Sequence, residues 1–344
     1  MASTAVAADK PSMVKLAKYD GPVRKMSKIL RDKCIMADPL LGKKLHERLA
    51  AQKAAGKIES EQWYQNPLKW LALTGIANPY KTVFNELRII YENGEAFLEQ
   101  FVKYKRQVFF GVGTGDTEIG LLYEVCDKIP PATLNIYAID VQKFYLKLFA
   151  QQLLILSERL RHKHHAKSEL WFQGYNYLFE DVKRRQLRLH PDFGCQMGDI
   201  GIALGNVIGN FENQHEILSQ FNRLNTQIVI LGVHLAREPR EMDYVFKLYR
   251  DNVIFNEFAR DAYLRAGGDP KRKTEWVIDK KTNAIRAFAG DTELFYSKKY
   301  DLDDLDAAMN ELGFGKVEFY IHEQSAICIF KRSDHSLVPR GLDV

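Results

Sequence analysis

Residues 108–115 read Val-Phe-Phe-Gly-Val-Gly-Thr-Gly, and this stretch decides the fold. A short apolar run ends in three glycines at alternate positions, and residues 118–127 continue with helical spacing. Glycines at a strand-to-helix turn let the backbone pass close to a ligand that faces the helix N-terminus. The stretch therefore predicts a cofactor-binding loop, although a turn of this kind also serves as a tight corner without a ligand.

The glycine spacing distinguishes between classes of nucleotide ligand. The pattern is GxGxG and not GxGxxG, and no GK(S/T) follows the glycines. The first departure disfavours a dinucleotide such as NAD, and the second disfavours a nucleoside triphosphate.

Short apolar runs alternate with longer amphipathic segments on the C-terminal side of this loop. A parallel sheet with crossover helices requires such an alternation. The apolar runs are 108–110, 134–139, 170–172, 200–204 and 228–231, and the expected helices are 118–127, 141–161 and 215–224.

The pattern changes after residue 235, where we expect helices and a hairpin before the sheet resumes. The expected elements are helices within 238–266, a hairpin of 275–278 and 284–289, a helix at 302–312 and strands at 316–322 and 325–330. A short turn makes the last two strands antiparallel neighbours. The parallel sheet therefore gains a reversed strand at the end of the chain.

The composition excludes several classes of protein. The formal net charge is +5 over 344 residues, with 44 acidic residues dispersed among the basic ones, so we expect no nucleic-acid partner. No apolar run approaches the roughly 20 residues that span a bilayer, so we expect no membrane partner. Four cysteines stand far apart without a CxxC pair, which indicates a reducing, cytoplasmic environment and no zinc cluster. The basic run 161–165 contains three histidines but ends an expected helix, where cations suit the helix dipole, and we expect no metal there.

A carboxylate and an amide-rich stretch follow two further strands. Asp140 ends the second strand, where a carboxylate accepts hydrogen bonds from both ribose hydroxyls of a nucleoside. Residues 204–212 follow the fourth strand and contain Asn206 and Asn210 together with two glycines. Open α/β sheets bind ligands at this carboxyl edge. Asp140 and Asn210 also suit a second role as helix caps, Asn210 for the helix that contains His215.

With these features the sequence resembles a known family, the S-adenosylmethionine-dependent methyltransferases that act on the α-amino group of histidine, with relatives that methylate indole amino acids. The similarity is collinear over about residues 60–332 and includes a stretch similar to the family's I-G-N-F signature. The matching segments are 63–65, 78–82, 111–115, Asp140, 208–213, 231–235, 248–251 and 296–300.

The resemblance implies an α/β fold with a defined division. It implies a Rossmann-like class I methyltransferase sheet with a terminal antiparallel hairpin, a helical N-terminal cap and an inserted α+β lobe. We expect the cap at 1–100, the S-adenosylmethionine-binding domain at 101–236 and 296–332, and the substrate-binding lobe at 237–295. Residues 333–344 contain Leu-Val-Pro-Arg-Gly, which looks like a thrombin-cleavage remnant of a tag, and are left out of the fold.

The resemblance also implies roles for individual residues. The residues expected to bind S-adenosylmethionine, whose product is S-adenosylhomocysteine, are Gly111, Gly113, Gly115, Asp140 and Tyr80. The residues expected to contact a small amine or amino-acid substrate are Tyr64, Asn210, Tyr249, Phe295 and Ser297, with Asn210 near its amino group. Tyr64 and Tyr249 are the candidate catalytic residues, because they are expected to shape the environment in which that amine loses its proton. Methyl transfer from a sulfonium needs no metal, and none is expected.

Two positions depart from the family pattern. Phe109 stands where a carboxylate usually precedes the glycine loop, which affects how the methionine part of the cofactor is anchored. Phe295 stands where the histidine-specific enzymes have a glutamate that grips the imidazole, and a phenyl ring cannot accept that hydrogen bond. Glu293 reaches that position only after a local shift of register.

The sequence thus predicts an S-adenosylmethionine-dependent N-methyltransferase that acts on the amino group of a small amino-acid-like substrate. Three alternatives stay open. They are a histidine N-alpha-methyltransferase proper, an NAD-dependent oxidoreductase, and a catalytically silent binding protein with a methyltransferase fold. Fold alone does not fix the acceptor atom.

Overall fold

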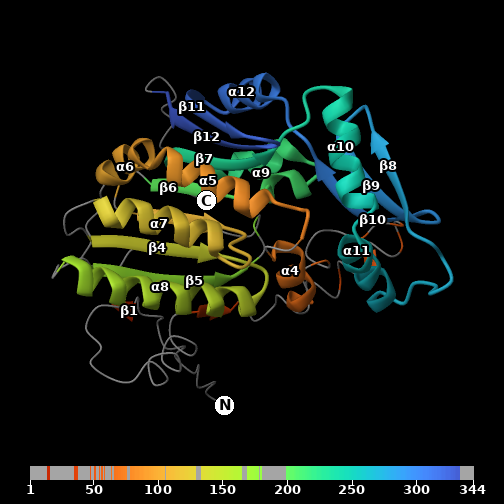
Figure 1. Cartoon of the computed structure of the whole chain (residues 1–344), viewed down its shortest axis with the longest axis horizontal. Coiled ribbons are helices and arrows are strands. Elements are labelled where there is room, and N and C mark those ends of the chain that lie inside the picture. Colours follow the sequence, from red (N-terminus) through yellow and green to blue (C-terminus); the bar gives the residue numbers. More distant parts are fainter. Residues whose placement is uncertain are drawn as a thin grey trace, which may run out of the picture.

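Five parallel strands form the middle of a mixed sheet in the computed structural model of the chain (Figure 1). The structure describes residues 66–75, 78–104, 106–128, 133–164, 169–177 and 199–333, together with 14–15, 35–37, 179 and isolated positions between 47 and 63. The five strands are β3 (Arg106–Phe110), β4 (Thr133–Ile139), β5 (Glu169–Asn176), β6 (Asp199–Ala203) and β7 (Thr226–His234). They correspond to the five expected apolar runs, so the prediction of a parallel sheet is confirmed. The expected tag remnant lies outside the described residues apart from Ser333.

The order of these strands reverses at β3. The sheet runs β5-β4-β3-β6-β7, so the chain fills one side of β3 with β4 and β5 and then returns to fill the other side. At such a switch point the loops that leave neighbouring strands diverge, and a crevice opens beyond the carboxyl ends of the strands. The glycine loop that follows β3 therefore lies where an open α/β sheet binds its ligand.

Helices cover both faces of the sheet, which explains why β3 and β7 are buried along nearly their whole length. Helices α5, α6, α7 and α8 pack on one face, and α9 and α12 pack on the other. Their bounds are α5 (Thr82–Glu92), α6 (Gly94–Lys103), α7 (Asp116–Lys128), α8 (Lys143–His164), α9 (Gln214–Arg223) and α12 (Leu302–Glu311).

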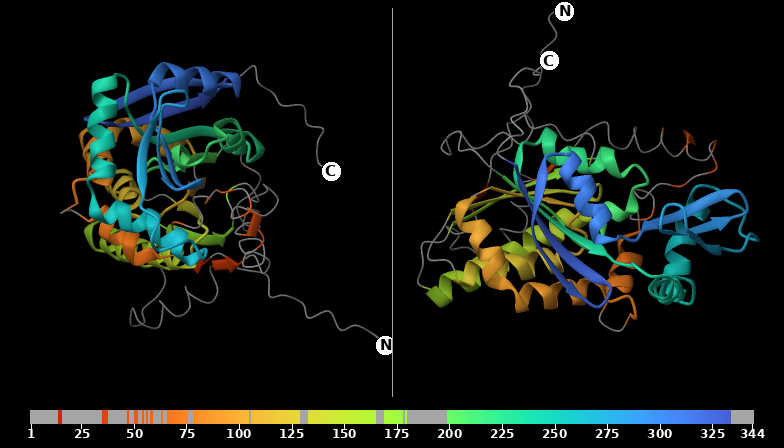
Figure 2. Two further views of the ribbon diagram at one scale, coloured as in Figure 1. Left: turned by 90° about the vertical axis from the view of Figure 1, so that its right-hand side faces the viewer. Right: turned by 90° about the horizontal axis from the view of Figure 1, so that it is seen from above.

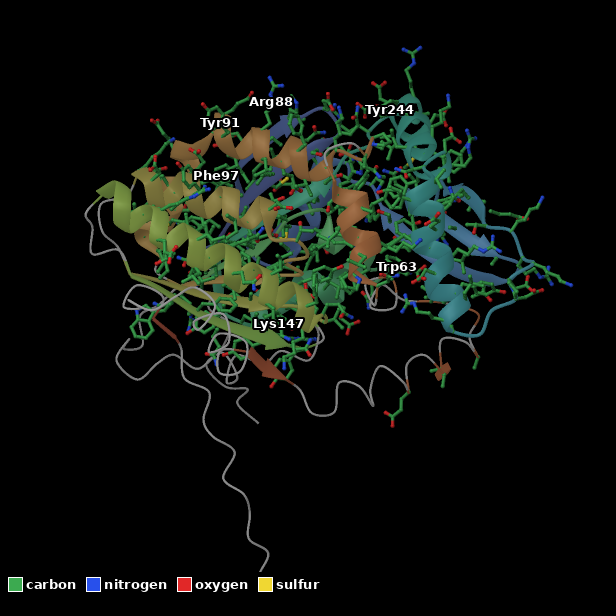
Figure 3. All side chains as sticks on the ribbon, turned by 60° about the horizontal axis from the view of Figure 1, so that its bottom comes forward. Trp63, Arg88, Tyr91, Phe97, Lys147 and Tyr244 are labelled. Carbon is green, nitrogen blue, oxygen red and sulfur yellow. The ribbon has the colours of Figure 1, made fainter. Side chains whose placement is uncertain are left out.

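Helix α5 shows how the sequence sorts side chains between the core and the surface. Ile89 and Ile90 are buried in the core on the first face of the sheet. Arg88 and Tyr91 point outward to solvent, whereas Phe97 of the following helix is fully buried (Figure 3). The alternation of apolar and polar positions at helical spacing is the reason that this segment forms a surface helix.

The last two strands complete the sheet. β12 (Ser325–Arg332) lies between β7 and β11 (Phe314–His322) and is antiparallel to both. The expected terminal hairpin and its reversed strand are therefore confirmed. The order β5-β4-β3-β6-β7-β12-β11, with β12 reversed, is the Rossmann-like sheet with a terminal antiparallel hairpin that the sequence predicted.

The N-terminal segment is not helical throughout. Two short strands, β1 (Val14–Lys15) and β2 (Ile35–Ala37), pair with β5, with Val14 opposite Phe172 and Ile35 opposite Gly174. The expectation of a helical cap over 1–100 did not include these two short strands. Pairing with the open edge of β5 is a long-range interaction, and local helical spacing does not report it. Helix α4 (Pro67–Thr74) and the two helices after it agree with the expectation.

A second, smaller sheet belongs to the segment between β7 and α12. This segment contains α10 (Pro239–Arg250), α11 (Val253–Arg265), β8 (Glu275–Asp279), β9 (Ala284–Ala289) and β10 (Thr292–Lys298). Its antiparallel strands run β10-β9-β8, and with the two helices they stand at one end of the central sheet (Figure 2). Strand β10 continues past residue 295, the expected end of the lobe, because Lys298 still pairs with Ala284.

Gly201 of β6 provides a test of this packing. A Cβ at Gly201 would lie 2.6 Å from Cδ1 of Phe221, which is fully buried on α9. We expect Gly201→Ala to lower the free energy of unfolding by about 1–3 kcal/mol, because α9 and β6 must move apart to make room for the added methyl group. Gly315→Ala on β11 is the matched control, since its nearest neighbouring atom is 3.8 Å away. Urea unfolding of both variants measures the difference, and equal stability would contradict the close approach of α9 to β6.

Candidate functional site

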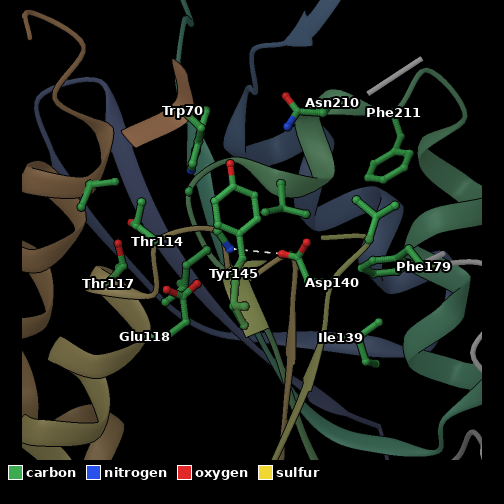
Figure 4. Close-up of a pocket in the computed structure, with 18 of the residues that line it drawn as sticks. Trp70, Thr114, Thr117, Glu118, Ile139, Asp140, Tyr145, Phe179, Asn210 and Phe211 are labelled. Atoms are coloured by element: carbon green, nitrogen blue, oxygen red, sulfur yellow. Dashed lines mark hydrogen bonds between the residues drawn. The ribbon is translucent and has the colours of Figure 1, made fainter. Parts of the chain in front are cut away.

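A pocket opens at the carboxyl ends of β3, β4 and β6, at the switch point of the sheet (Figure 4). The loops after these strands form most of its wall, and α4, α7 and α8 add side chains. The residues that line it are Trp70, Val83, Gly111, Val112, Gly113, Thr114, Thr117, Glu118, Ile139, Asp140, Val141, Tyr145, Tyr177, Phe179, Leu204, Gly205, Val207, Asn210 and Phe211.

The glycine loop needs its glycines for conformation and for space. Gly111, Gly113 and Gly115 have φ angles of +64°, +48° and +80°, in the left-handed region that suits glycine. A Cβ at Gly111 would lie 2.9 Å from both methyl groups of Val207, so no side chain fits there. Gly111 and Gly113 line the pocket, whereas Gly115 lies beyond the lining residues and packs close to Phe149.

Asp140 connects two of the loops that form the pocket. Its Oδ2 accepts a hydrogen bond from the Gly113 N–H at 3.2 Å (Figure 4), and its Oδ1 accepts one from the Gln142 N–H at 2.7 Å. The second contact closes the turn before α8, which begins at Lys143, and does not cap an N–H group of the helix itself. Burial raises the pKa of Asp140 to about 7, against the lowering effect of these two N–H groups.

The loop after β6 forms the opposite wall of the pocket. Asn206 adopts a left-handed conformation with φ +59°, and its Oδ1 accepts a hydrogen bond from the His234 N–H at 3.0 Å. Asn210 ends the short 3-10 helix η4 (Val207–Asn210) and lines the pocket. The cap of α9 is Asn213, whose side chain accepts from the Glu216 N–H, so the alternative that Asn210 caps this helix was wrong.

Two of the expected substrate residues lie together beside the pocket. The Tyr249 hydroxyl is 3.4 Å from Ser297 Oγ, and both are buried. The Nδ2 of Asn206 donates to Ser297 Oγ at 3.3 Å, which links this pair to the loop after β6. Neither residue belongs to the lining of the pocket itself.

Of the remaining expected residues, Phe295 and Tyr80 lie among aromatic side chains near Tyr249, and Tyr64 is not described. Phe295 packs against Trp63 at 4.6 Å and against Trp276 at 5.6 Å between ring centroids. Tyr80 lies in the same region, with its ring 5.7 Å from that of Tyr249, and does not line the pocket. Tyr64 lies outside the described residues. Glu293 forms an ion pair with Arg286 at 3.2 Å.

Lys299 is a buried residue that the sequence analysis missed. Its Nζ donates to Ser297 Oγ at 2.7 Å and to the Tyr249 hydroxyl at 2.9 Å, and the residue is fully buried. Burial holds the pKa of Lys299 well below its usual range, and no carboxylate within the described chain pairs with it. Burial therefore favours the uncharged form of this amine. Lys299 follows β10 directly and stands two residues after Ser297, which was the available signal.

Two buried carboxylates were also missed. Glu118 lies in the first turn of α7 and lines the pocket, and it is 5% exposed. Glu86 of α5 lies behind the wall, where both of its oxygens accept from the Gly205 N–H at 2.9 Å. Burial raises the pKa of Glu86 to about 8, and burial with neighbouring acids raises that of Glu118. The signal for Glu118 was its place directly after the glycine loop, where the first helical turn faces a ligand.

The described residues show neither a metal-ion cluster nor a membrane-spanning helix. They contain no group of three or more His, Cys, Asp or Glu side chains arranged to hold a metal ion. No helix among them has the length and apolar character needed to cross a membrane.

Comparison with solved structures finds similar folds among methyltransferases. Magnesium protoporphyrin IX methyltransferase from Synechocystis PCC 6803, with bound SAH, is 11% identical; the match covers 79% of this chain and 96% of that one, with a TM-score of 0.42. 1,6-Didemethyltoxoflavin-N1-methyltransferase from Burkholderia thailandensis is 7% identical, with coverage of 80% and 92% and a TM-score of 0.39. No model of a known family matches the sequence, and no curated protein matches it either. These similarities concern the fold, and the chemistry rests on the residues of the pocket.

The charge of Lys299 can be tested through stability. Because its pKa is lower in the fold than in the unfolded chain, the unfolded state binds one more proton between those two values. The contribution of Lys299 to the free energy of unfolding therefore rises with pH, by up to about 1.4 kcal/mol per pH unit. We expect Lys299→Met to be more stable than the wild type near neutral pH. The difference in their free energies of unfolding should become smaller toward pH 10.

The measurement is urea unfolding between about pH 7 and pH 10. Lys280→Met, at an exposed lysine between β8 and β9, is the matched control and should keep the wild-type slope. Equal slopes in the wild type and Lys299→Met would show that Lys299 stays charged in the fold.

Proposed function

We propose that the protein is an S-adenosylmethionine-dependent N-methyltransferase that acts on the amino group of a small amino-acid-like substrate. The observation that carries the proposal is the hydrogen bond between the Gly113 N–H and Asp140 in the pocket. It joins the cofactor loop after β3 to a carboxylate after β4 at the switch point, where that carboxylate suits the two ribose hydroxyls of a nucleoside. Each oxygen of Asp140 keeps a lone pair for such a contact.

The charge of the pocket supports a cationic nucleoside over a dinucleotide. Glu118 and Asp140 line it, and none of the described lining residues is Lys, Arg or His. The pyrophosphate of NAD is negatively charged and would meet two acidic side chains and no basic one, whereas a sulfonium is positively charged. This distribution disfavours the alternative of an NAD-dependent oxidoreductase.

The chain's contribution to the chemistry is alignment and exclusion of water. S-adenosylmethionine, when bound, supplies a methyl group on a sulfonium that an amine displaces in line. Gly111, Gly113 and Asp140 are proposed to hold the nucleoside, and Tyr145 and Phe179, which also line the pocket, are proposed to shield it from solvent. Asn210, on the wall formed after β6, is proposed to hold the amino group of the acceptor.

The acceptor amine must be neutral when it reacts, since an ammonium has no lone pair. Tyr249 and Tyr64 are proposed to shape the environment in which the proton leaves. The hydrogen bond from Lys299 to Tyr249 fixes the hydroxyl of Tyr249 for this role.

The identity of the residues near Ser297 supports an acceptor other than histidine. Phe295 lies in an aromatic cluster and accepts no hydrogen bond from an imidazole. Glu293 is engaged by Arg286 and is not available as a substitute. A site that recognises a polar group discriminates strongly by that contact, so its loss removes the basis for histidine selection.

The proposed cofactor contact is tested by Asp140→Ala. We expect its affinity for S-adenosylhomocysteine to fall by about 10²-fold, because a charged group that accepts two hydrogen bonds is lost. Isothermal titration calorimetry measures the affinity. Asp243→Ala, at an exposed position on α10, is the matched control and should bind like the wild type.

Unchanged affinity in Asp140→Ala, or binding of NAD without binding of S-adenosylhomocysteine, would overturn the proposal. Binding of S-adenosylhomocysteine without methylation of any member of a broad panel of amines and amino acids would favour the catalytically silent alternative.

A further inference from the structure

The wall of the pocket is acidic on the side of α5 and α7. Glu118 and Asp140 line the pocket and are 5% and 7% exposed. Glu86, which is fully buried, lies one layer behind them and is held by the Gly205 N–H and by the side chain of Thr117. Since Gly205 and Thr117 both line the pocket, Glu86 is separated from it by one residue only.

Glu118 has no opposite charge beside it. Within the described chain its hydrogen-bond donor is its own backbone N–H, and the charged groups that face it are the acids Glu86, Asp116 and Asp140. An ionised carboxylate in such surroundings is unfavourable unless a cation approaches it. The pocket therefore presents a buried acid whose missing partner is a positive charge on a ligand.

We propose that Glu118 recognises the positive charge of S-adenosylmethionine and makes the pocket prefer this cofactor over its product, S-adenosylhomocysteine. The inference rests on the proposed function. The cofactor carries an ammonium, a sulfonium and one carboxylate, a net charge of +1. Transfer breaks the bond between sulfur and the methyl carbon, forms a bond from nitrogen to that carbon, and leaves the electron pair on sulfur. The product is therefore a neutral thioether with no net charge, and Glu118 attracts it less.

This preference is coupled to protons. The pKa of Asp140 is raised to about 7 and that of Glu86 to about 8, so the pocket without a cation holds protons at neutral pH. A cation lowers the pKa of a nearby carboxyl group, and protons leave when it binds. S-adenosylmethionine should therefore release more protons on binding than S-adenosylhomocysteine does.

The experiment is calorimetric titration of both compounds into the wild type, Glu118→Gln and Glu124→Gln. Glutamine keeps the shape of Glu118 and removes its charge. Glu124 lies on the same helix, beside Lys128 and away from the pocket, so its variant is the matched control. We expect the wild type to bind S-adenosylmethionine about tenfold more tightly than S-adenosylhomocysteine. Glu118→Gln should lose most of this preference, and Glu124→Gln should keep it.

Titration of the wild type in phosphate and in Tris at pH 7 measures proton release without any variant. Greater release with S-adenosylmethionine supports the inference, and equal release for the two compounds contradicts it. Equal loss of affinity for both compounds in Glu118→Gln also contradicts it, since a shape effect would act on both. If neither compound binds the wild type, the proposed function fails instead.

Discussion

The structure depends on a loop after β3 whose Gly111 and Gly113 must approach neighbouring loops without a Cβ. Gly111 lies against the methyl groups of Val207, and the Gly113 N–H reaches Asp140. The loops after β3, β4 and β6 are thereby fixed against one another at the point where the order of the strands reverses. These two contacts keep the crevice open and place the carboxyl group of Asp140 in its wall, where a ligand can reach it.

Buried ionisable groups surround the crevice in two separate places. Carboxyl groups lie on the side of α5 and α7, and the buried amine of Lys299 lies beside β10 with Tyr249 and Ser297. Burial without an opposite charge costs stability at both places. Such groups concentrate at functional sites, where a ligand supplies the missing charge or hydrogen bond. The acids suit a sulfonium, and the hydroxyls beside Lys299 suit a polar acceptor.

The sequence predicted the strands of the central sheet, but it did not predict the buried side chains behind the wall of the pocket. Apolar runs and the glycine loop predicted β3 to β7, because buried parallel strands leave a strong local pattern. The strands at Val14 and Ile35 were missed, since they form only through pairing with β5. Asp140 was found because it ends a strand, whereas Glu86 comes from a distant helix and contacts Gly205 only in the folded chain.

We propose that the crevice at the switch point binds an adenosyl cofactor through Asp140. A crystal structure of the protein grown with S-adenosylhomocysteine tests it most directly. The account predicts ribose hydroxyls within hydrogen-bonding distance of both Asp140 oxygens and the thioether near Asn210. Electron density for the compound elsewhere, or a crevice closed by the protein's own side chains, would contradict the account.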